Sequence, residues 1–184
     1  LAVRTLVSAK ERTQALDMFT RMLSRPEFPA DVLEREKVRL IGSLKESDTR
    51  PDTIAAINFY RLVYRDHPYA LRSSGEVATV EGITRDDLAA FHRRHYAAQN
   101  AVVAIIGAIS RAEAEAIAEE VTRGLPQAAG AEPPLPPVPA LAAGASQVIA
   151  HPASQAHILI GAPGITRTDP DYFPLFIGNY VQIG

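Results

Sequence analysis

A proline-rich segment late in the chain places the strongest limit on what the sequence can fold into. Residues 128–146 consist mainly of proline, alanine and glycine, and five prolines lie between residues 133 and 139. Proline has no backbone N–H and interrupts helices and central strands, and the segment has too few large apolar residues to form a core. We therefore expect a linker at 128–146, one folded region at 1–127 and the start of a second at 147–184.

On both sides of this linker, the spacing of apolar residues predicts helices and a few strands. Helices are expected at residues 9–23, 31–47, 53–64, 77–81, 84–96 and 111–123, and another after Asp171. Asp31, Thr84 and Ser110 are residue types that cap helices, and Asp87 would complete a capping box with Thr84. Short apolar runs predict strands at 2–7, 101–107, 147–150 and 156–161. The expected fold class is α+β.

The two ends of the chain resemble interruptions of a longer sequence. The first expected strand has no turn signal before it, and the apolar, helix-like stretch 172–184 stops without a terminating residue pattern. We therefore expect a piece of a larger protein, in which the aromatic and leucine side chains of Tyr172, Phe173, Leu175 and Phe176 form an exposed apolar patch.

Composition excludes several classes of function. A formal net charge of −2 gives no basic footprint for nucleic acid. The absence of cysteine excludes disulfides, thiolate zinc sites and cysteine nucleophiles. No apolar run reaches the roughly 18 residues of a membrane span, so no transmembrane segment is expected.

Histidines and carboxylates offer few chemical sites when they are considered by themselves. His92 and His95 lie three residues apart, but no third ligand is near and two arginines between them would repel a cation. His67 is interpreted as a structural loop residue, and His151 and His157 have no evident partner. The acidic residues of the second helix are interpreted as a solvated face balanced by basic neighbours, rather than as an acid–base pair; they are Glu34, Glu36, Glu46 and Asp48, and the basic residues are Arg35, Lys37, Arg39 and Lys45.

An ordered set of short motifs resembles the pitrilysin/insulinase family of zinc metallopeptidases, in the branch of the mitochondrial processing peptidases and bacterial two-subunit relatives. The resemblance covers nearly the whole chain and implies an antiparallel sheet with helices packed on one face. Residues 1–127 would be the C-terminal part of a first peptidase-like domain, and 147–184 the incomplete start of a homologous second one. The matching motifs are Phe28-Pro29, Leu33-Glu34-Arg35-Glu36-Lys37, His67-Pro68-Tyr69, Gly75, Val80 to Leu88, Tyr96 with Asn100, Val103 to Gly107, Gly124-Leu125-Pro126, Asp171-Tyr172-Phe173 and Gly178-Asn179-Tyr180.

The same resemblance implies a zinc site that this chain does not complete. Catalytic members carry an inverted His-x-x-Glu-His motif, which would precede Leu1 and does not occur here. A third ligand, a glutamate, lies seven residues after a supporting glutamate on a downstream helix. The supporting position matches Glu36, and the ligand position falls on Ser43, whose neutral hydroxyl is a poor zinc ligand. Glu46 lies three residues further along, on a different part of the helix face.

The resemblance leaves three functions open. The first is a non-catalytic partner subunit that grips the substrate of a two-subunit metalloendopeptidase, with zinc in the catalytic partner and the gripping arginine and tyrosine beyond Gly184. The second is a fragment of an active zinc metalloendopeptidase, whose motif lies upstream. The third is a non-proteolytic structural or binding subunit. We expect no zinc bound by this chain and no peptide hydrolysis by the chain alone; its partners would be a catalytic zinc-protease subunit or further copies of itself, and a peptide or protein substrate. Bacterial relatives suggest a periplasmic location.

Overall fold

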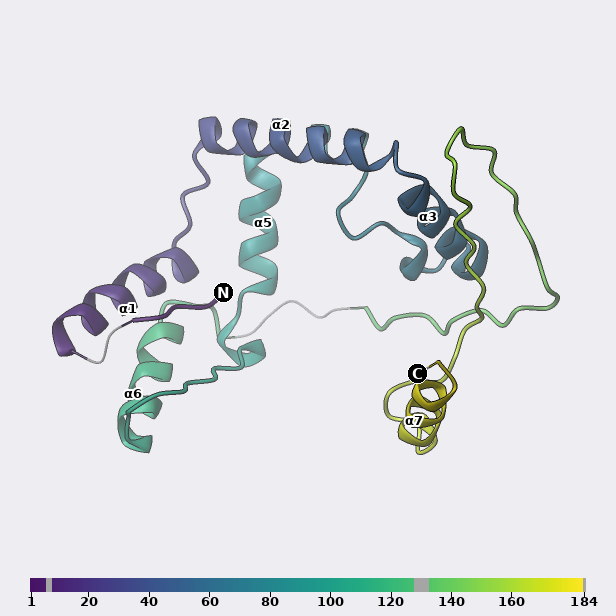
Figure 1. Ribbon diagram of the computed structural model, residues 1–184. Helices are drawn as coiled ribbons and strands as arrows, with labels where there is room; N and C mark the ends of the chain where they lie inside the picture. Colours follow the sequence, from purple (N-terminus) through teal and green to yellow (C-terminus); the bar gives the residue numbers. More distant parts are fainter. Residues whose placement is uncertain (6–7, 128–132, 184) are drawn as a thin grey trace. The chain divides into compact units, whose positions relative to one another are not determined.

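The computed structural model describes residues 1–5, 8–127 and 133–183, and every regular element within them is a helix (Figure 1). Seven α-helices and two short 3₁₀ helices occur in the described residues. They are α1 (Ala9–Ser24), α2 (Ala30–Ser47), α3 (Pro51–Tyr64), η1 (Pro68–Ala70), α4 (Val77–Gly82), α5 (Arg85–His95), η2 (Ala98–Asn100), α6 (Arg111–Thr122) and α7 (Tyr172–Ile183).

The helices predicted from apolar spacing are confirmed, and two of the predicted caps form in full. Thr84 and Asp87 make a reciprocal capping box at the start of α5. Ser110 does the same with Glu113 at the start of α6. The prediction for Asp31 was wrong by one position, because α2 already begins at Ala30 and Asp31 lies in its first turn.

The expected α+β fold with an antiparallel sheet was wrong, because the described residues contain no strand. A strand needs a partner that satisfies its backbone N–H and C=O groups, and the described parts of the four predicted strands have no ladder of backbone hydrogen bonds. The apolar run 101–107 shows the difference most clearly, since Val102 is 95% exposed and Ile106 is 100% exposed. Of the predicted strand 2–7, residues 6 and 7 lie outside the described residues.

Contacts divide the chain into two compact units. One comprises Leu1–Ile41 and Ala78–Pro133, and the other comprises Gly42–Val77 and Pro134–Gly184. The linker at 128–146, expected between a first domain and the start of a second, stays a prediction. Its first five residues lie outside the described residues, and residues 133–146 contain no helix or strand.

In the first unit, α1 packs against α6. Arg12 of α1 forms an ion pair with Glu113 of α6 at 3.8 Å. At the ends of the two helices, Gly124 lies so close to Ser24 that an added Cβ would come within 2.7 Å of the serine Cβ. A glycine is therefore required where these two chain segments meet.

A bend between α1 and α2 is held by Arg85, the first residue of α5. Its guanidinium donates to the backbone carbonyls of Glu27 and Phe28 over 2.9 to 3.2 Å. Phe28 has a φ of 48°, a left-handed conformation that is uncommon for a residue with a large side chain. The charge-assisted bonds from Arg85 stabilise the chain where its backbone is strained.

In the second unit, α3 packs against η1, and Leu44 and Val63 are buried. The loop after η1 is fixed by Arg72, which pairs with Asp48 at 2.6 Å and also donates to the Ser47 hydroxyl. The rings of Tyr64 and Tyr69 meet edge to face, with centroids 5.6 Å apart. These contacts position η1, whose N-cap residue is His67.

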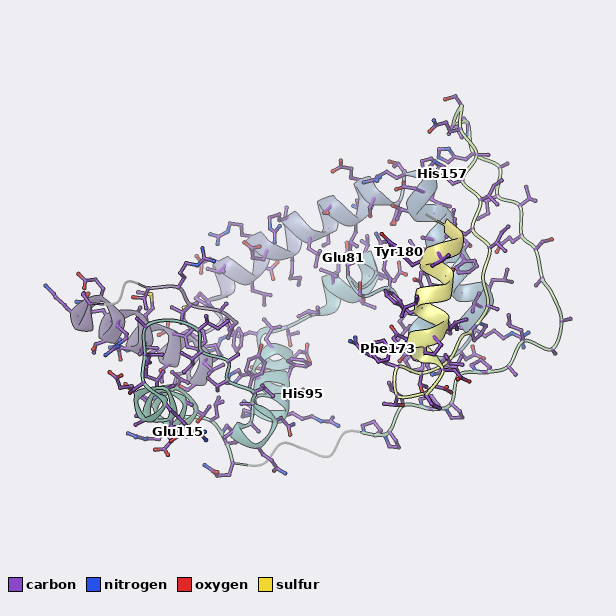
Figure 2. All side chains as sticks on the ribbon, turned by 60° about the horizontal axis from the view of Figure 1, so that its bottom comes forward. Glu81, His95, Glu115, His157, Phe173 and Tyr180 are labelled. Carbon is purple, nitrogen blue, oxygen red and sulfur yellow. The ribbon has the colours of Figure 1, made fainter. Side chains whose placement is uncertain are left out.

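The last helix, α7, exposes most of its apolar side chains. Phe173 and Tyr180, which Figure 2 labels on this helix, are 60% and 75% exposed. Leu175 and Phe176 are also exposed, as predicted, whereas Tyr172 is half-buried beside the ring of Phe176. Among the described residues, no helix is both long enough and apolar enough to cross a membrane.

Candidate functional site

Glu36 lies half-buried on the surface of α2, beside two arginines of the same helix. Its carboxylate accepts from Arg39 at 2.8 Å and lies 3.5 Å from the guanidinium of Arg35. The hydrogen bond from Arg39 and the positive charge of that side chain, assisted by Arg35, hold the pKa of Glu36 below its ordinary value. The carboxylate is therefore ionised at neutral pH, and its nearest partners are cations of its own helix.

Ser43 lies two turns further along the same helix and is exposed. It follows Gly42, around which nothing lies within 4 Å of an added Cβ, and precedes the buried Leu44. The Ser43 hydroxyl carries no negative charge, and the carboxylate of Glu36 is already ion-paired with Arg39 and Arg35. These residues do not fit a zinc ion, which takes three or four His, Asp, Glu or Cys ligands.

The acidic residues of α2 and the following turn each have a basic partner or lie in solvent. Glu34 pairs with Lys37 at 3.4 Å. The partner of Asp48 is Arg72, which comes from the loop after η1 and not from α2. Glu46 is exposed. The sequence interpretation of a charge-balanced, solvated face is confirmed for Glu34 and Glu36, and for Asp48 the balance comes from a residue that the sequence did not indicate.

The close pair His92 and His95 is engaged in packing. His92 Nε2 lies 2.7 Å from the Leu23 carbonyl oxygen, which can only accept, so the ring donates through this nitrogen. Its ring also stacks on Tyr96 with a centroid separation of 4.7 Å. The ring of His95 lies 4.3 Å from that of Phe91. A donating Nε2 has no lone pair for a metal, and across the described residues no group of three or more histidine or acidic side chains could hold one.

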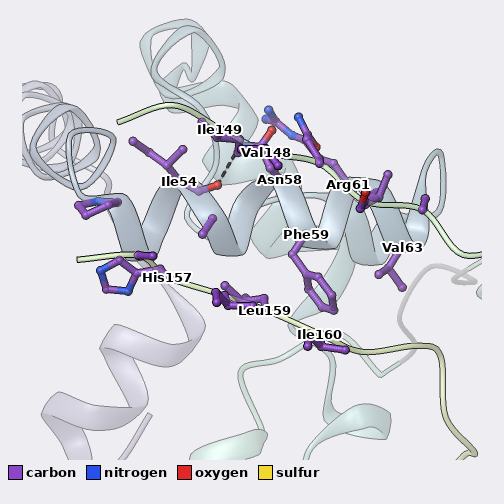
Figure 3. A pocket seen from close by; sticks show the side chains of 18 of the residues that line it. Ile54, Asn58, Phe59, Arg61, Val63, Val148, Ile149, His157, Leu159 and Ile160 are labelled. Carbon is purple, nitrogen blue, oxygen red and sulfur yellow. Dashed lines mark hydrogen bonds between the residues drawn. The ribbon is translucent and has the colours of Figure 1, made fainter. Parts of the chain in front are cut away.

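The remaining histidines differ in burial. His67 is 6% exposed and has hydrogen-bond partners at both ring nitrogens, Pro136 and Tyr69. His151 is exposed, with Nε2 at 3.2 Å from the carbonyl oxygen of Thr49. His157 is exposed as well, and Figure 3 shows it beside α3.

A groove of about 1110 Å³ runs along α3 in the second unit (Figure 3). The helix contributes Ile54, Phe59 and Val63, and the segments around Val148 and Ile160 contribute apolar side chains from the opposite sides. Gly161 touches the ring of Phe59, since an added Cβ would lie 2.9 Å from its Cζ. The sequence analysis did not find this groove, because its walls are about 90 residues apart in the chain.

The described lining of the groove is apolar and cationic. Its walls include Arg61, Arg65 and two histidines, and no aspartate or glutamate among the described residues lines it. Arg61 is held by Glu76 at 2.7 Å, outside the lining.

Comparison with known proteins gives one consistent result. The sequence profile of a family described as "Peptidase M16 inactive domain" matches residues 82–181. Over 163 residues the chain is 24% identical to the mitochondrial-processing peptidase subunit beta of Saccharomyces cerevisiae, an alignment that covers 87% of this chain and 35% of the relative. It is 25% identical over 163 residues to an uncharacterized zinc protease of Streptomyces coelicolor, covering 84% of this chain and 35% of that protein.

A solved structure agrees with these sequence matches. The crystal structure of a peptidase M16 inactive domain from Pseudomonas fluorescens superimposes with a TM-score of 0.66 at 35% sequence identity, and the match covers 69% of this chain and 31% of that one. The chain therefore spans about a third of the length of each of these three relatives.

Proposed function

The chain belongs to the peptidase M16 inactive domain family, and from this premise we propose that it is part of a non-catalytic subunit that grips the substrate of a two-subunit zinc metalloendopeptidase. The predicted membership of the metallopeptidase family is confirmed by the family match and by the relatives that are named zinc proteases and processing peptidases. The subunit role goes beyond that membership and rests on the residues of α2.

The observation that carries the proposal is the pair Glu36 and Ser43. The family resemblance implies a zinc-binding glutamate at the position of Ser43, supported by the glutamate at position 36. In an α-helix, seven residues span nearly two turns, so the two positions lie close to the same face of α2. A serine there removes the negative charge that a zinc ligand would supply, and Arg39 and Arg35 neutralise Glu36. The substitution favours a subunit that leaves zinc to a partner.

The groove along α3 supports a binding role. Apolar walls and the cationic Arg61 and Arg65, without a lining carboxylate, favour contact with a peptide chain over its hydrolysis. The resemblance places the substrate-gripping arginine and tyrosine after Gly184, so the groove would supply additional contact surface and not those two residues.

A second candidate function is favoured by the names of the relatives. Several are described as zinc proteases, including the Streptomyces coelicolor protein. If the full protein carries its own His-x-x-Glu-His before Leu1, it would be an active metalloendopeptidase, and the zinc would need a third ligand other than Ser43. A third candidate is a structural or binding subunit without any part in proteolysis.

Reconstitution separates these three functions. The protein that contains this chain, a zinc-carrying family member encoded beside it and an equimolar mixture of both are each assayed on a fluorogenic peptide library, with and without a chelator. We expect hydrolysis in the mixture at a rate well above that of either protein alone, and its loss with the chelator. Hydrolysis by this protein alone would establish the second candidate, and a mixture no faster than the partner alone would establish the third.

The matched variants are Ser43→Ala and Glu36→Gln. Neither should change the rate of the mixture, because the proposal assigns no metal contact to either residue. A rate that falls with Ser43→Ala would place this serine in the catalytic machinery and contradict the proposal.

A further inference from the structure

The ring of His67 has a defined proton position. Its Nδ1 accepts a hydrogen bond from the backbone N–H of Tyr69 at 3.1 Å, so this nitrogen carries a lone pair and no proton. The neutral ring must then carry its proton on Nε2, which lies 2.9 Å from the carbonyl oxygen of Pro136 and donates to it. One neutral tautomer thus joins the start of η1 to a segment 69 residues away.

The segment that His67 holds is residues 134–139, which we call the proline segment. Four of its residues are prolines, which cannot donate backbone hydrogen bonds, so its attachment relies on its carbonyl groups. His67 supplies such a bond, from its Nε2 to the carbonyl oxygen of Pro136. Leu135 is 62% exposed, so the segment lies on the surface and is not buried in a core.

Two tyrosine rings lie beside the imidazole. The ring of Tyr69 meets it edge to face with centroids 4.7 Å apart, and that of Tyr64 lies at 6.1 Å. His67 is buried, with 6% of its surface exposed. Among the described residues no acidic side chain forms an ion pair with it, and the carboxylates of Glu76 and Asp48 pair with arginines. Its chain neighbours Arg65 and Asp66 are exposed, and residues 134–139 contain no titratable side chain.

Protonation would act on the two hydrogen bonds in opposite ways. The bond from Nε2 to Pro136 would strengthen, because charge-assisted bonds are roughly twice as strong as neutral ones. At Nδ1, however, the new N–H would face the N–H of Tyr69, so one bond would be replaced by two opposed donors. The positive charge would also be buried without a counter-ion, which adds a desolvation cost. The two losses exceed the one gain, so a charged ring must turn outward and leave Pro136.

We propose that His67 is a pH-sensitive clasp, which holds the proline segment at the start of η1 while its ring is neutral and releases the segment when the ring is protonated. The device would set the freedom of the chain that connects η1 to the walls of the groove, because the proline segment leads directly into residues 141–161.

A single spin label tests the clasp, because the chain has no native cysteine. The nitroxide is attached at Leu135→Cys in the full chain, and its mobility is measured between pH 8 and pH 5. We expect the ratio of released to held segment to rise on acidification by at most about tenfold per pH unit, because each release takes up one proton. A mobility that stays constant over this range would overturn the proposal.

Two substitutions divide the functions of the ring. His67→Gln keeps an N–H at the position of Nε2 but cannot titrate, so the label should stay held at both pH values. His67→Asn keeps an acceptor near Nδ1 for Tyr69 but cannot reach Pro136, so the label should be mobile at both. The matched control is His157→Gln, an exposed histidine, which should leave the transition intact. A pH transition that persists in His67→Gln or His67→Asn would assign it to another group and refute the clasp.

The tautomer of His67 can be measured in the unsubstituted protein, so this second test does not require that any variant folds. In ¹⁵N-histidine NMR spectra at pH 8, His67 should show a protonated Nε2 and an unprotonated Nδ1. A proton on Nδ1 at this pH would show that the bond from Tyr69 is absent and would overturn the proposal.

Discussion

Replacement of Gly161 by alanine tests how closely residues 156–161 approach α3. An alanine Cβ at this position would lie 2.9 Å from Cζ of Phe59 and 3.8 Å from both Cε atoms. Real Cβ atoms essentially never approach another carbon to 2.9 Å, so either the ring or the segment must move. The φ of Gly161 is outside the left-handed range, and backbone strain therefore makes no contribution.

The expected loss of stability follows from two opposed effects. Overpacking costs about 1–3 kcal/mol when a neighbour cannot relax freely. Alanine also restricts the unfolded chain more than glycine does, which stabilises the fold by about 0.4–1 kcal/mol. Phe59 is half-buried and its ring lies edge to face on Tyr60, so it can move only in part. We expect a net destabilisation of about 1 kcal/mol for Gly161→Ala.

Urea unfolding followed by far-UV circular dichroism measures this difference. Gly164→Ala is the matched control, since nothing lies within 4 Å of its added Cβ, and it should be neutral or slightly stabilising. Phe59→Leu should relieve the clash, so the double variant should be more stable than the sum of the two single effects. If Gly161→Ala and Gly164→Ala give the same free energy of unfolding, residues 156–161 do not rest on Phe59 and the groove does not have this wall.

Two further predictions concern the first unit. Ser110→Ala should lower stability by about 1 kcal/mol at neutral pH, through loss of the N-cap of α6. The hydroxyl and the backbone N–H of Ser110 hold the pKa of Glu113 below its ordinary value in the folded chain. The stability that this capping box contributes is therefore present at pH values above the pKa of Glu113 in the unfolded chain, and it is lost as the pH falls through the lower pKa of Glu113 in the folded chain. The difference between Ser110→Ala and the parent should therefore shrink in unfolding curves taken at decreasing pH, and an unchanged difference would contradict the capping box. Arg85→Ala should lower the free energy of unfolding in urea by about 1–2 kcal/mol, because it removes charge-assisted bonds to two carbonyls at the strained Phe28. Arg85→Lys should recover only part of this loss. If Arg85→Ala leaves the free energy of unfolding unchanged, the bend does not depend on the guanidinium.

Local interactions explain which parts of the fold could be predicted from the sequence. The capping boxes of α5 and α6 each involve residues three positions apart, so the sequence contains all that determines them. The ion pair of Glu36 with Arg39 is equally local. For these elements, residue type and spacing were sufficient.

The strands failed for a non-local reason. An apolar run such as 101–107 has a composition suited to a strand, but a strand exists only where another segment pairs with it. In the described residues nothing pairs with this run, and Val102 remains exposed. Composition therefore described what the segment could do with a partner and not what it does in this fold.

The candidate sites divide in the same way. Glu36 and Ser43 could be assigned to one helix from the sequence, because they lie seven residues apart on it. The contact of His67 with Pro136 spans 69 residues, and nothing in either local sequence indicates it. The groove along α3 likewise depends on segments that are brought together only by the fold.

The central claim, that this chain leaves zinc to a partner, is tested most directly by the zinc content of the purified protein that contains it. Zinc per chain is measured by mass spectrometry of the metal for the parent, Ser43→Ala and Ser43→Glu after exposure to excess zinc and gel filtration. We predict well below one zinc per chain for the parent, unchanged by Ser43→Ala, because a neutral hydroxyl beside an ion-paired Glu36 is a poor ligand set. One zinc per chain in the parent, lost on Ser43→Ala, would contradict the account.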